Sequence, residues 1–318
     1  MADLVAALTA YEWPVPQRDA DVGVASLAAA AAQVKRLYQS GRHADAVRTL
    51  PDVLRQARAA RSAAPEARSS QVDALVADIY HVVGSVLLKF GDASLAMVAA
   101  DRSMTAAQRS DEPIAIAGSA RLATHALMSS GHPDRAADMA QSVVERFDRL
   151  VPKPPEDGLA VRGALLLRGA IASARHEERE RSLQLLDEAS AVGERVGRDG
   201  NLRWTAFGPT NVLLHRLNVA VTLGDAGHAI AYAKQVRLDR VALAERRACL
   251  FIDVARAFTQ WGKHDKAYQA LRTAEKISPQ ELQVRRTVHR LISDLICAVP
   301  NRLQAPLREM AERIGAAV

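Results

Sequence analysis

The sequence predicts an all-α fold, a right-handed helical solenoid of about six helix-hairpin repeats with capping helices at its ends. Two observations lead to this prediction. A pattern of glycine, alanine and aliphatic residues recurs five times along the chain, and the hairpins that it marks, together with a degenerate one near residue 176, are roughly 38 to 50 residues apart, as expected for stacked repeats. Aromatic residues make up only 4% of the chain, whereas strands favour aromatic and β-branched residues.

In each occurrence of the pattern, an alanine follows a glycine by five positions. Small or aliphatic residues follow the same glycine by nine and twelve positions, with the small but polar Ser103 as the one departure. An apolar residue precedes each glycine by four positions. The five sets are Gly41 with Ala46, Leu50 and Val53; Gly91 with Ala96, Ala100 and Ser103; Gly131 with Ala136, Ala140 and Val143; Gly224 with Ala229, Ala233 and Val236; and Gly262 with Ala267, Leu271 and Ala274.

Steric arguments explain this spacing. Glycine takes the positive φ that ends one helix and turns the chain into the next. Alanine at the crossing lets the two helices pack closely, and the later residues face the neighbouring repeat. The pattern is typical of a solenoid of the tetratricopeptide (TPR) type. An alanine-rich helical protein with unrelated hairpins is the alternative.

The predicted elements follow in chain order. Residues 3–11 suit a short helix that Trp13-Pro14-Val15-Pro16 ends, and the first long helix covers about 20–40. Hairpins follow near residues 41, 91, 131, 176, 224 and 262. Pro51 predicts a kink or break. Pro279 opens the last full helix, and Pro300 and Pro306 bracket a terminal capping helix.

The fourth unit is degenerate. His176 stands where the turn glycine is expected, and Ser182, Leu186 and Ala189 follow with a slip of one residue. The proline-rich segment 151–158 precedes it and predicts a loop, with a hinge between two halves. The predicted division is an N-terminal segment 1–19, repeats one to three in 20–150, the loop 151–158, and repeats four to six with the cap in 159–318.

Composition narrows the class of protein. The chain has two cysteines, Cys249 and Cys297, which predict buried thiols in a reducing compartment. No apolar run of membrane-spanning length and no signal peptide is expected, so we predict a cytoplasmic protein without a membrane partner. The net charge is +6, but basic and acidic residues are interleaved, which favours a solvated surface over a nucleic-acid footprint.

Catalytic motifs are not found in the sequence. His176-Glu177 resembles the start of a zinc-protease helix, but Glu180 stands where the second histidine would be. A phosphate-binding glycine loop, a Gly-x-Ser-x-Gly motif and paired cysteines are also absent. We therefore expect no enzymatic activity, no metal and no cofactor.

The concave groove is the predicted binding site. In a TPR stack, residues thirteen, ten, six and two positions before each turn glycine face inward, and Lys35 and Gln39 do so in the first unit. Polar side chains there suit a ligand with an exposed backbone or carboxylate. The alternative is that they are merely solvated. The predicted groove residues are Asp78, His81, Arg121, His125, Trp204, Phe207, Asn211, Asn218 and Arg256.

Several of these residues have specific expected roles. Asn211 and Asn218 lie two turns apart on one helical face, and such a pair can clamp an extended peptide. Arg121 and Arg256 could neutralise a carboxylate. Phe207 is expected near the groove mouth with Trp204, the alternative being a helix-start staple with core aromatic residues.

Long stretches of the chain resemble the C-terminal TPR region of actinobacterial regulators that begin with an Xre-type helix-turn-helix. The most specific stretch is Gly197 to Val212 (GRDGNLRWTAFGPTNV). In such regulators a DNA-binding domain precedes a segment like LTAY, whereas here Met1 stands almost directly on that segment. The other matching stretches are Leu4–Tyr11, Leu50–Leu54, Leu95–Ala107, Gly163–Ala174, Ala244–Ala257 and Ala274–Pro279.

The resemblance implies a regulatory role, in which a peptide or small-molecule effector binds the groove and controls transcription through conformational change or homodimerisation. DNA would be bound only through a helix-turn-helix domain that this chain does not contain. The alternative function is a protein–protein interaction scaffold whose groove holds a partner's tail, with no small effector.

Overall fold

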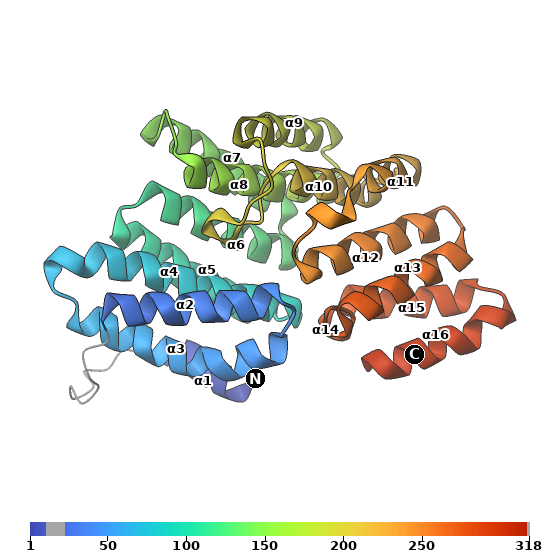
Figure 1. The fold of residues 1–318 in the computed structure, drawn as a ribbon, viewed down its shortest axis with the longest axis horizontal. Helices are drawn as coiled ribbons and strands as arrows, with labels where there is room; N and C mark the ends of the chain where they lie inside the picture. The colour runs from blue at the N-terminus through green and yellow to red at the C-terminus, as the bar shows by residue number, and fades with distance from the viewer. Residues whose placement is uncertain (11–22, 317–318) are drawn as a thin grey trace.

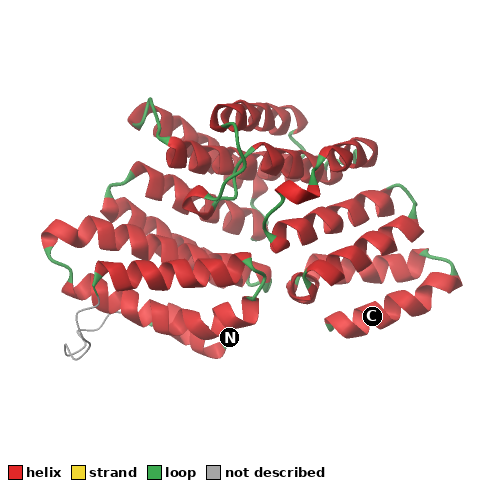
Figure 2. Ribbon diagram, in the orientation of Figure 1, coloured by secondary structure: helices red, strands yellow, loops and turns green. Residues whose placement is uncertain are grey.

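The structure is a computed structural model that describes residues 1–10 and 23–316. It is 84% helical, and the described part of the chain contains sixteen α-helices, two 3-10 turns and no strand (Figures 1 and 2). The predicted all-α solenoid is therefore confirmed. The predicted break at Trp13–Pro16 lies outside the described residues.

Successive helices form antiparallel hairpins that stack side by side. Even-numbered helices from α2 to α12 form the inner layer, and odd-numbered helices from α3 to α13 cover them. The helices are α1 (Ala2–Thr9), α2 (Val24–Gln39), α3 (His43–Ala63), α4 (Glu66–Lys89), α5 (Ala93–Ser110), α6 (Pro113–Ser129), α7 (Pro133–Leu150), α8 (Glu156–Arg175), α9 (Arg179–Val196), α10 (Pro209–Thr222), α11 (Ala226–Gln235), α12 (Ala244–Gln260), α13 (His264–Ile277), α14 (Pro279–Val284), α15 (Arg286–Ala298) and α16 (Asn301–Ile314).

The hairpin turns form where the glycine pattern predicts them. The five turn glycines have φ between 68° (Gly262) and 89° (Gly131), in the left-handed region that side chains disfavour. The alanines five positions later have no exposed surface, because each lies between crossing helices. These alanines are Ala46, Ala96, Ala136, Ala229 and Ala267.

Three local expectations need correction. Helix α3 continues through Pro51, which is buried, and α16 continues through Pro306. Each proline removes one backbone hydrogen bond from its helix, and packing against neighbouring helices offsets that loss. Pro279 opens only the six-residue α14.

The degenerate turn keeps the same geometry without glycine. Glu177 takes the left-handed conformation with φ of 64°, one residue after His176. The slip of one residue in the sequence pattern therefore corresponds to a slip in the turn itself.

The proline-rich segment lies within a continuous stack. Helix α8 begins at Glu156, directly after the loop. A single hydrophobic cluster includes Ala140 and Phe147 from before the loop and Leu165 and Leu186 from after it. The loop therefore does not separate two hydrophobic cores.

The sequence led us to expect no apolar segment long enough to span a membrane, but helix α4 is such a segment. By length and composition alone it could cross a membrane, and 61% of its apolar window is buried inside the structure. Neighbouring helices of the stack pack on both sides of it. We therefore interpret α4 as a core helix of the solenoid.

The solenoid curls until its C-terminal repeats touch its N-terminal repeats. In Figure 1, α14 lies beside the ends of α2, α3 and α5. The His43 backbone N–H donates to the Gln280 side chain at 3.0 Å. A side chain at Gly41 would place its Cβ 2.8 Å from the Ser278 hydroxyl, so this turn approaches the C-terminal repeats closely. The inner helices thus surround an interior space.

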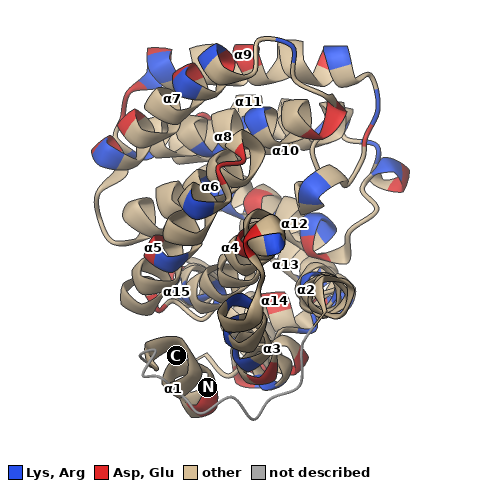
Figure 3. Ribbon diagram, turned by 90° about the vertical axis from the view of Figure 1, so that its left-hand side faces the viewer, with Lys and Arg blue, Asp and Glu red and all other residues tan. Residues whose placement is uncertain are grey.

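The outer surface has no dominant sign of charge along the helices seen in Figure 3. Lysine and arginine occur together with aspartate and glutamate on both α7 and α9. This mixture agrees with the solvated surface expected from the sequence.

Candidate ligand-binding site in the solenoid interior

The interior of the solenoid contains a cavity of about 620 Å³. Its walls come mainly from α2, α4, α6, α8, α10, α12 and α15, and from residues 203–205 between α9 and α10. This volume lies in the range of roughly 300–1,000 Å³ that small-molecule sites have. A molecule held there would touch repeats from both ends of the chain.

The structure brings together most of the predicted groove residues around this cavity. Whether they bind a ligand stays a prediction. The predicted residues that line the cavity are Asp78, His81, Arg121, His125, Trp204, Asn218 and Arg256, together with Lys35 and Gln39 from the first unit.

Phe207 and Asn211 do not line the cavity. Phe207 is 1% exposed and belongs to the hydrophobic core, so the alternative of a core aromatic describes it correctly. Asn211 is also buried, and its side-chain oxygen has no hydrogen-bond partner. Asn218 donates to Asp253 at 2.9 Å. The two asparagines are therefore not presented to the cavity as a matched pair.

The Phe207 ring lies directly on Gly163 of α8. An alanine at Gly163 would place its Cβ in steric conflict with the ring. We expect Gly163→Ala to lower the free energy of unfolding by about 1–3 kcal/mol, because the ring must move within a packed core. Gly227→Ala is the matched control, since nothing lies within 4 Å of the added atom. Denaturant unfolding measures the difference, and equal values for the two variants would contradict the packing described here.

The segment 197–208 connects α9 to α10 and crosses the face of the stack (Figure 2). We call it the strap. Arg203, Trp204 and Ala206 have φ of 48°, 59° and 53°, which are strained values for residues other than glycine. The strap's 3-10 turn packs on α8.

Side-chain hydrogen bonds hold the strap against the first repeat. Asn201 donates to Gln39 of α2 at 2.7 Å, and the Gln39 amide donates to the Trp204 carbonyl at 3.1 Å. The Lys35 ammonium lies 5.8 Å from the centre of the Trp204 ring. The strap thus places Trp204 in the cavity wall and links the degenerate repeat to the first one.

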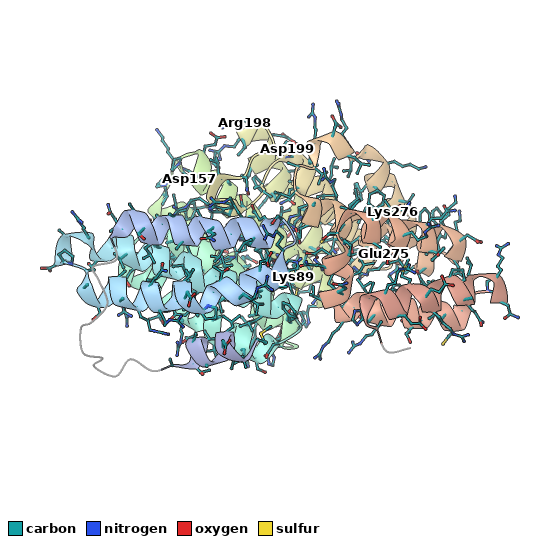
Figure 4. All side chains as sticks on the ribbon, turned by 60° about the horizontal axis from the view of Figure 1, so that its bottom comes forward. Lys89, Asp157, Arg198, Asp199, Glu275 and Lys276 are labelled. Carbon is teal, nitrogen blue, oxygen red and sulfur yellow. The ribbon has the colours of Figure 1, made fainter. Side chains whose placement is uncertain are left out.

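A buried group of ionisable residues joins the two ends of the solenoid. We call Lys89, His43, Glu245, Glu281 and Arg285 the closure cluster. Lys89 of α4 donates to Glu245 of α12 at 2.7 Å and to Glu281 of α14 at 2.8 Å. His43 Nε2 lies 2.7 Å from Glu281, and Arg285 donates to Glu281 at 2.8 Å. In Figure 4, Lys89 lies between the N-terminal and C-terminal helices.

Lys89, Glu245 and Glu281 of the closure cluster stay ionised at neutral pH. Burial disfavours charge on Lys89 and Glu245, but attraction between the opposite charges outweighs it. The pKa of Lys89 is therefore raised, and that of Glu245 is lowered to about 2. Lys89 and Arg285 likewise hold the pKa of Glu281 well below its usual range.

Glu245, Cys249 and Glu281 have the donor atoms of a metal site, all within 4.8 Å of one another. The Lys89 ammonium takes the position between the two carboxylates that a cation would need. Burial also raises the pKa of the Cys249 thiol to about 12, so it is protonated and a poor metal ligand. We interpret this group as an internal ion pair.

Three histidines near the cavity are neutral. Burial and nearby arginines lower the pKa values of His81 and His125 well below the usual range, and that of His215 to about 3. His215 Nδ1 donates to the Asn211 carbonyl at 2.8 Å, which leaves Nε2 as an acceptor.

This predicts a loss of stability in mild acid. Below pH 6.5 the unfolded chain takes up protons at these histidines while the folded chain does not, so stability falls as pH decreases. We expect His215→Gln to reduce the slope of stability against pH by up to about 1.4 kcal/mol per pH unit between pH 6.5 and 5. The measurement is denaturant unfolding at several pH values. An unchanged slope would show that His215 is not held neutral.

Sequence reasoning missed several cavity residues. Arg168 and Arg175 belong to the degenerate repeat, where no glycine marks the position from which to count. Arg246 lies sixteen residues before Gly262, about one helical turn beyond the expected inward-facing position thirteen residues before the glycine. The acidic partners of Lys89 come from repeats far along the chain, and no local signal identifies them.

Comparisons with known proteins identify the fold alone. No described protein family matches the sequence, and no curated protein matches it. The structure of the apo form of RapI resembles this chain with a TM-score of 0.53 and 13% identity, covering 91% of this chain and 95% of RapI. BtubC (BKLC) from P. vanneervenii gives a TM-score of 0.48 and 17% identity, covering 79% of this chain and 91% of BtubC.

Proposed function

We propose that this chain is the sensing part of a regulator and binds its effector inside the solenoid. The observation that supports this proposal is the cavity, to which every inner helix from α2 to α12 contributes. Its walls contain charged, neutral polar and apolar groups, as binding sites for small organic ligands do.

The response to the effector would be a change in how the solenoid closes. The cavity lies beside the closure cluster, so a ligand there contacts helices on both sides of the junction. A ligand changes a conformational equilibrium only if it binds one arrangement better than the other. Here the two arrangements would differ in the distance between the first and last repeats.

The sequence resemblance suggests how this change is used. In a transcriptional regulator, the solenoid would pass its state to a homodimer interface or to a separate DNA-binding domain. This role requires no enzymatic activity, cofactor or metal of the chain itself, and it fits a cytoplasmic location.

A protein-interaction scaffold is the second proposal. The polar cavity wall that would receive a partner's tail is the same. The cavity volume of about 620 Å³ limits such a tail to a short segment. This volume favours the effector over the scaffold.

Hydrogen–deuterium exchange tests where the effector binds. The purified chain is compared with and without the low-molecular-weight fraction of an extract of its source culture. We expect slower exchange in α4, α6, α8, α10 and α12, with the outer helices α7, α9 and α11 as internal controls. Unchanged exchange, or protection only on the outer helices, would contradict the proposal.

A further inference from the structure

The cavity walls carry an excess of positive charge. Eleven lysines and arginines line the cavity, against the three carboxylates of Asp78, Glu245 and Asp253. Lys35 lies 2.6 Å from Asp78, and Arg256 lies 2.9 Å from Asp253. Glu245 belongs to the closure cluster. The lining carboxylates are therefore already paired. Five of the eleven lining cations form no ion pair within the described residues, namely Arg121, Arg168, Arg175, Arg286 and Arg290.

Three arginines from three different inner helices are left with buried, unpartnered nitrogens. The Nε atoms of Arg121, Arg168 and Arg246 are buried and have no hydrogen-bond partner. Arg121 makes one side-chain hydrogen bond, 3.1 Å to the neutral His81. Arg246 Nε lies 3.4 Å from Glu245, a carboxylate that Lys89 already holds.

Arg168 is the most isolated of the three. Within residues 1–10 and 23–316, its side chain has no hydrogen bond and no ion pair. Burial, Arg121 and Arg246 lower the pKa of Arg168 to about 9, and burial and Arg246 lower that of Arg121 to about 10. Both values lie above neutral pH, so the guanidinium groups carry their charge and repel one another.

His215 identifies the space that the three arginines share. Apart from burial, its pKa is lowered by Arg246, Arg168 and Arg121. The three arginines and His215 also line the same cavity, so the three positive charges act on one buried, neutral imidazole. Three cations that share one carboxylate, Glu245, with Lys89 are costly to bury, and an anion of the right shape lowers that cost.

We propose that Arg121, Arg168 and Arg246 form a binding site for the oxyanion group of the effector, a phosphate or carboxylate on a small organic molecule. Guanidinium groups bind both kinds of oxyanion in a bidentate manner. The identity of the bound molecule as an effector rests on the proposed function, whereas the oxyanion site itself does not.

The rest of the cavity suits the remainder of such a ligand. Leu122, Ile171 and Ile252 supply apolar walls, and Trp204 supplies an aromatic one. The free Nε2 of His215 can accept a hydrogen bond from a hydroxyl or amine. An organic molecule with an oxyanion at one end and apolar or hydroxyl groups elsewhere would use all these surfaces.

Isothermal titration calorimetry with defined oxyanions tests the site. Sodium pyrophosphate and sodium citrate are titrated separately, at constant ionic strength, into the wild-type chain and into Arg168→Met. Arg195→Gln is the charge-matched control, because Arg195 is exposed on α9 and far from the cavity lining. Pyrophosphate binding points to a phosphate ligand and citrate binding to a carboxylate ligand.

We expect saturable binding of at least one probe to the wild type and to Arg195→Gln. Arg168→Met should weaken that binding by about tenfold or more. A thermal melt checks that the variant is folded, and Arg121→Met is the second variant. No saturable binding of either probe, or equal binding by the wild type and both methionine variants, would overturn the oxyanion site. In that case hydrogen–deuterium exchange with the extract could still show a ligand in the cavity. The oxyanion site can therefore be disproved without disproving the proposed sensing function.

Discussion

Replacing Lys89 with methionine should lower the free energy of unfolding by about 3–5 kcal/mol, the cost of breaking a buried ion pair from one side. The lysine side chain is 7% exposed and holds two buried carboxylates, Glu245 and Glu281. Methionine has a similar length, so the packing loss is small. The charge loss leaves Glu245 without its strongest partner. Denaturant unfolding at pH 7 measures the change.

Two further variants separate this electrostatic effect from a general loss of packing. Lys153→Met removes a lysine on the exposed proline-rich loop and should leave stability nearly unchanged. Adding Glu245→Gln to Lys89→Met should recover part of the loss, because it removes one uncompensated buried charge. A Lys89→Met variant as stable as Lys153→Met would contradict the closure cluster as a determinant of stability.

Arg168→Met should have the opposite effect and stabilise the ligand-free chain, because an apolar side chain avoids the cost of burying a charge. Replacing whole buried ion pairs by apolar side chains gains up to about 1–4 kcal/mol, and we expect a gain within that range. Most substitutions destabilise a protein, so an increase is diagnostic. Arg168 costs stability because its guanidinium is partly buried without a counter-charge and is repelled by Arg121 and Arg246. A protein keeps such a group at a cost where it serves binding.

The matched control for this prediction is Arg162→Met on the same helix. Arg162 donates to Asp148 at 2.6 Å, so its charge already has a partner. Removing that charge therefore relieves no electrostatic repulsion. We expect thermal unfolding at a higher temperature for Arg168→Met and at an equal or lower temperature for Arg162→Met. A destabilised Arg168→Met would show that the arginine supports the fold rather than a ligand.

The repeat architecture could be predicted because its determinants are local. The glycine at each turn and the alanine five positions later are fixed by backbone sterics and helix crossing, and both recur within one repeat. The same helical periodicity placed His81, Arg121 and His125 on the concave wall. Phe207 was placed wrongly because an aromatic residue at a helix start suits a groove mouth and a core equally well.

The closure cluster and the strap depend on the path of the whole solenoid. Lys89 is 156 residues from Glu245 and 192 from Glu281, so their meeting depends on how every intervening repeat is oriented. Arg168 lies nine residues before Glu177, and His215 lies nine residues before Gly224, the residues with positive φ in their turns. The nearest inward-facing position expected from the sequence is ten residues before the turn, so both were missed by one position. The same position also lines the cavity in the regular repeats, where Val82 and Leu122 occupy it.

Native mass spectrometry of the purified chain, incubated with the low-molecular-weight fraction of its source culture, tests the central claim most directly. The wild type is compared with the Arg121→Met/Arg168→Met double variant and with Arg195→Gln. We predict the same discrete added mass on the wild type and on Arg195→Gln, and its loss from the double variant. No added mass on any chain, or an equal mass on the double variant, would contradict an effector held by the interior arginines.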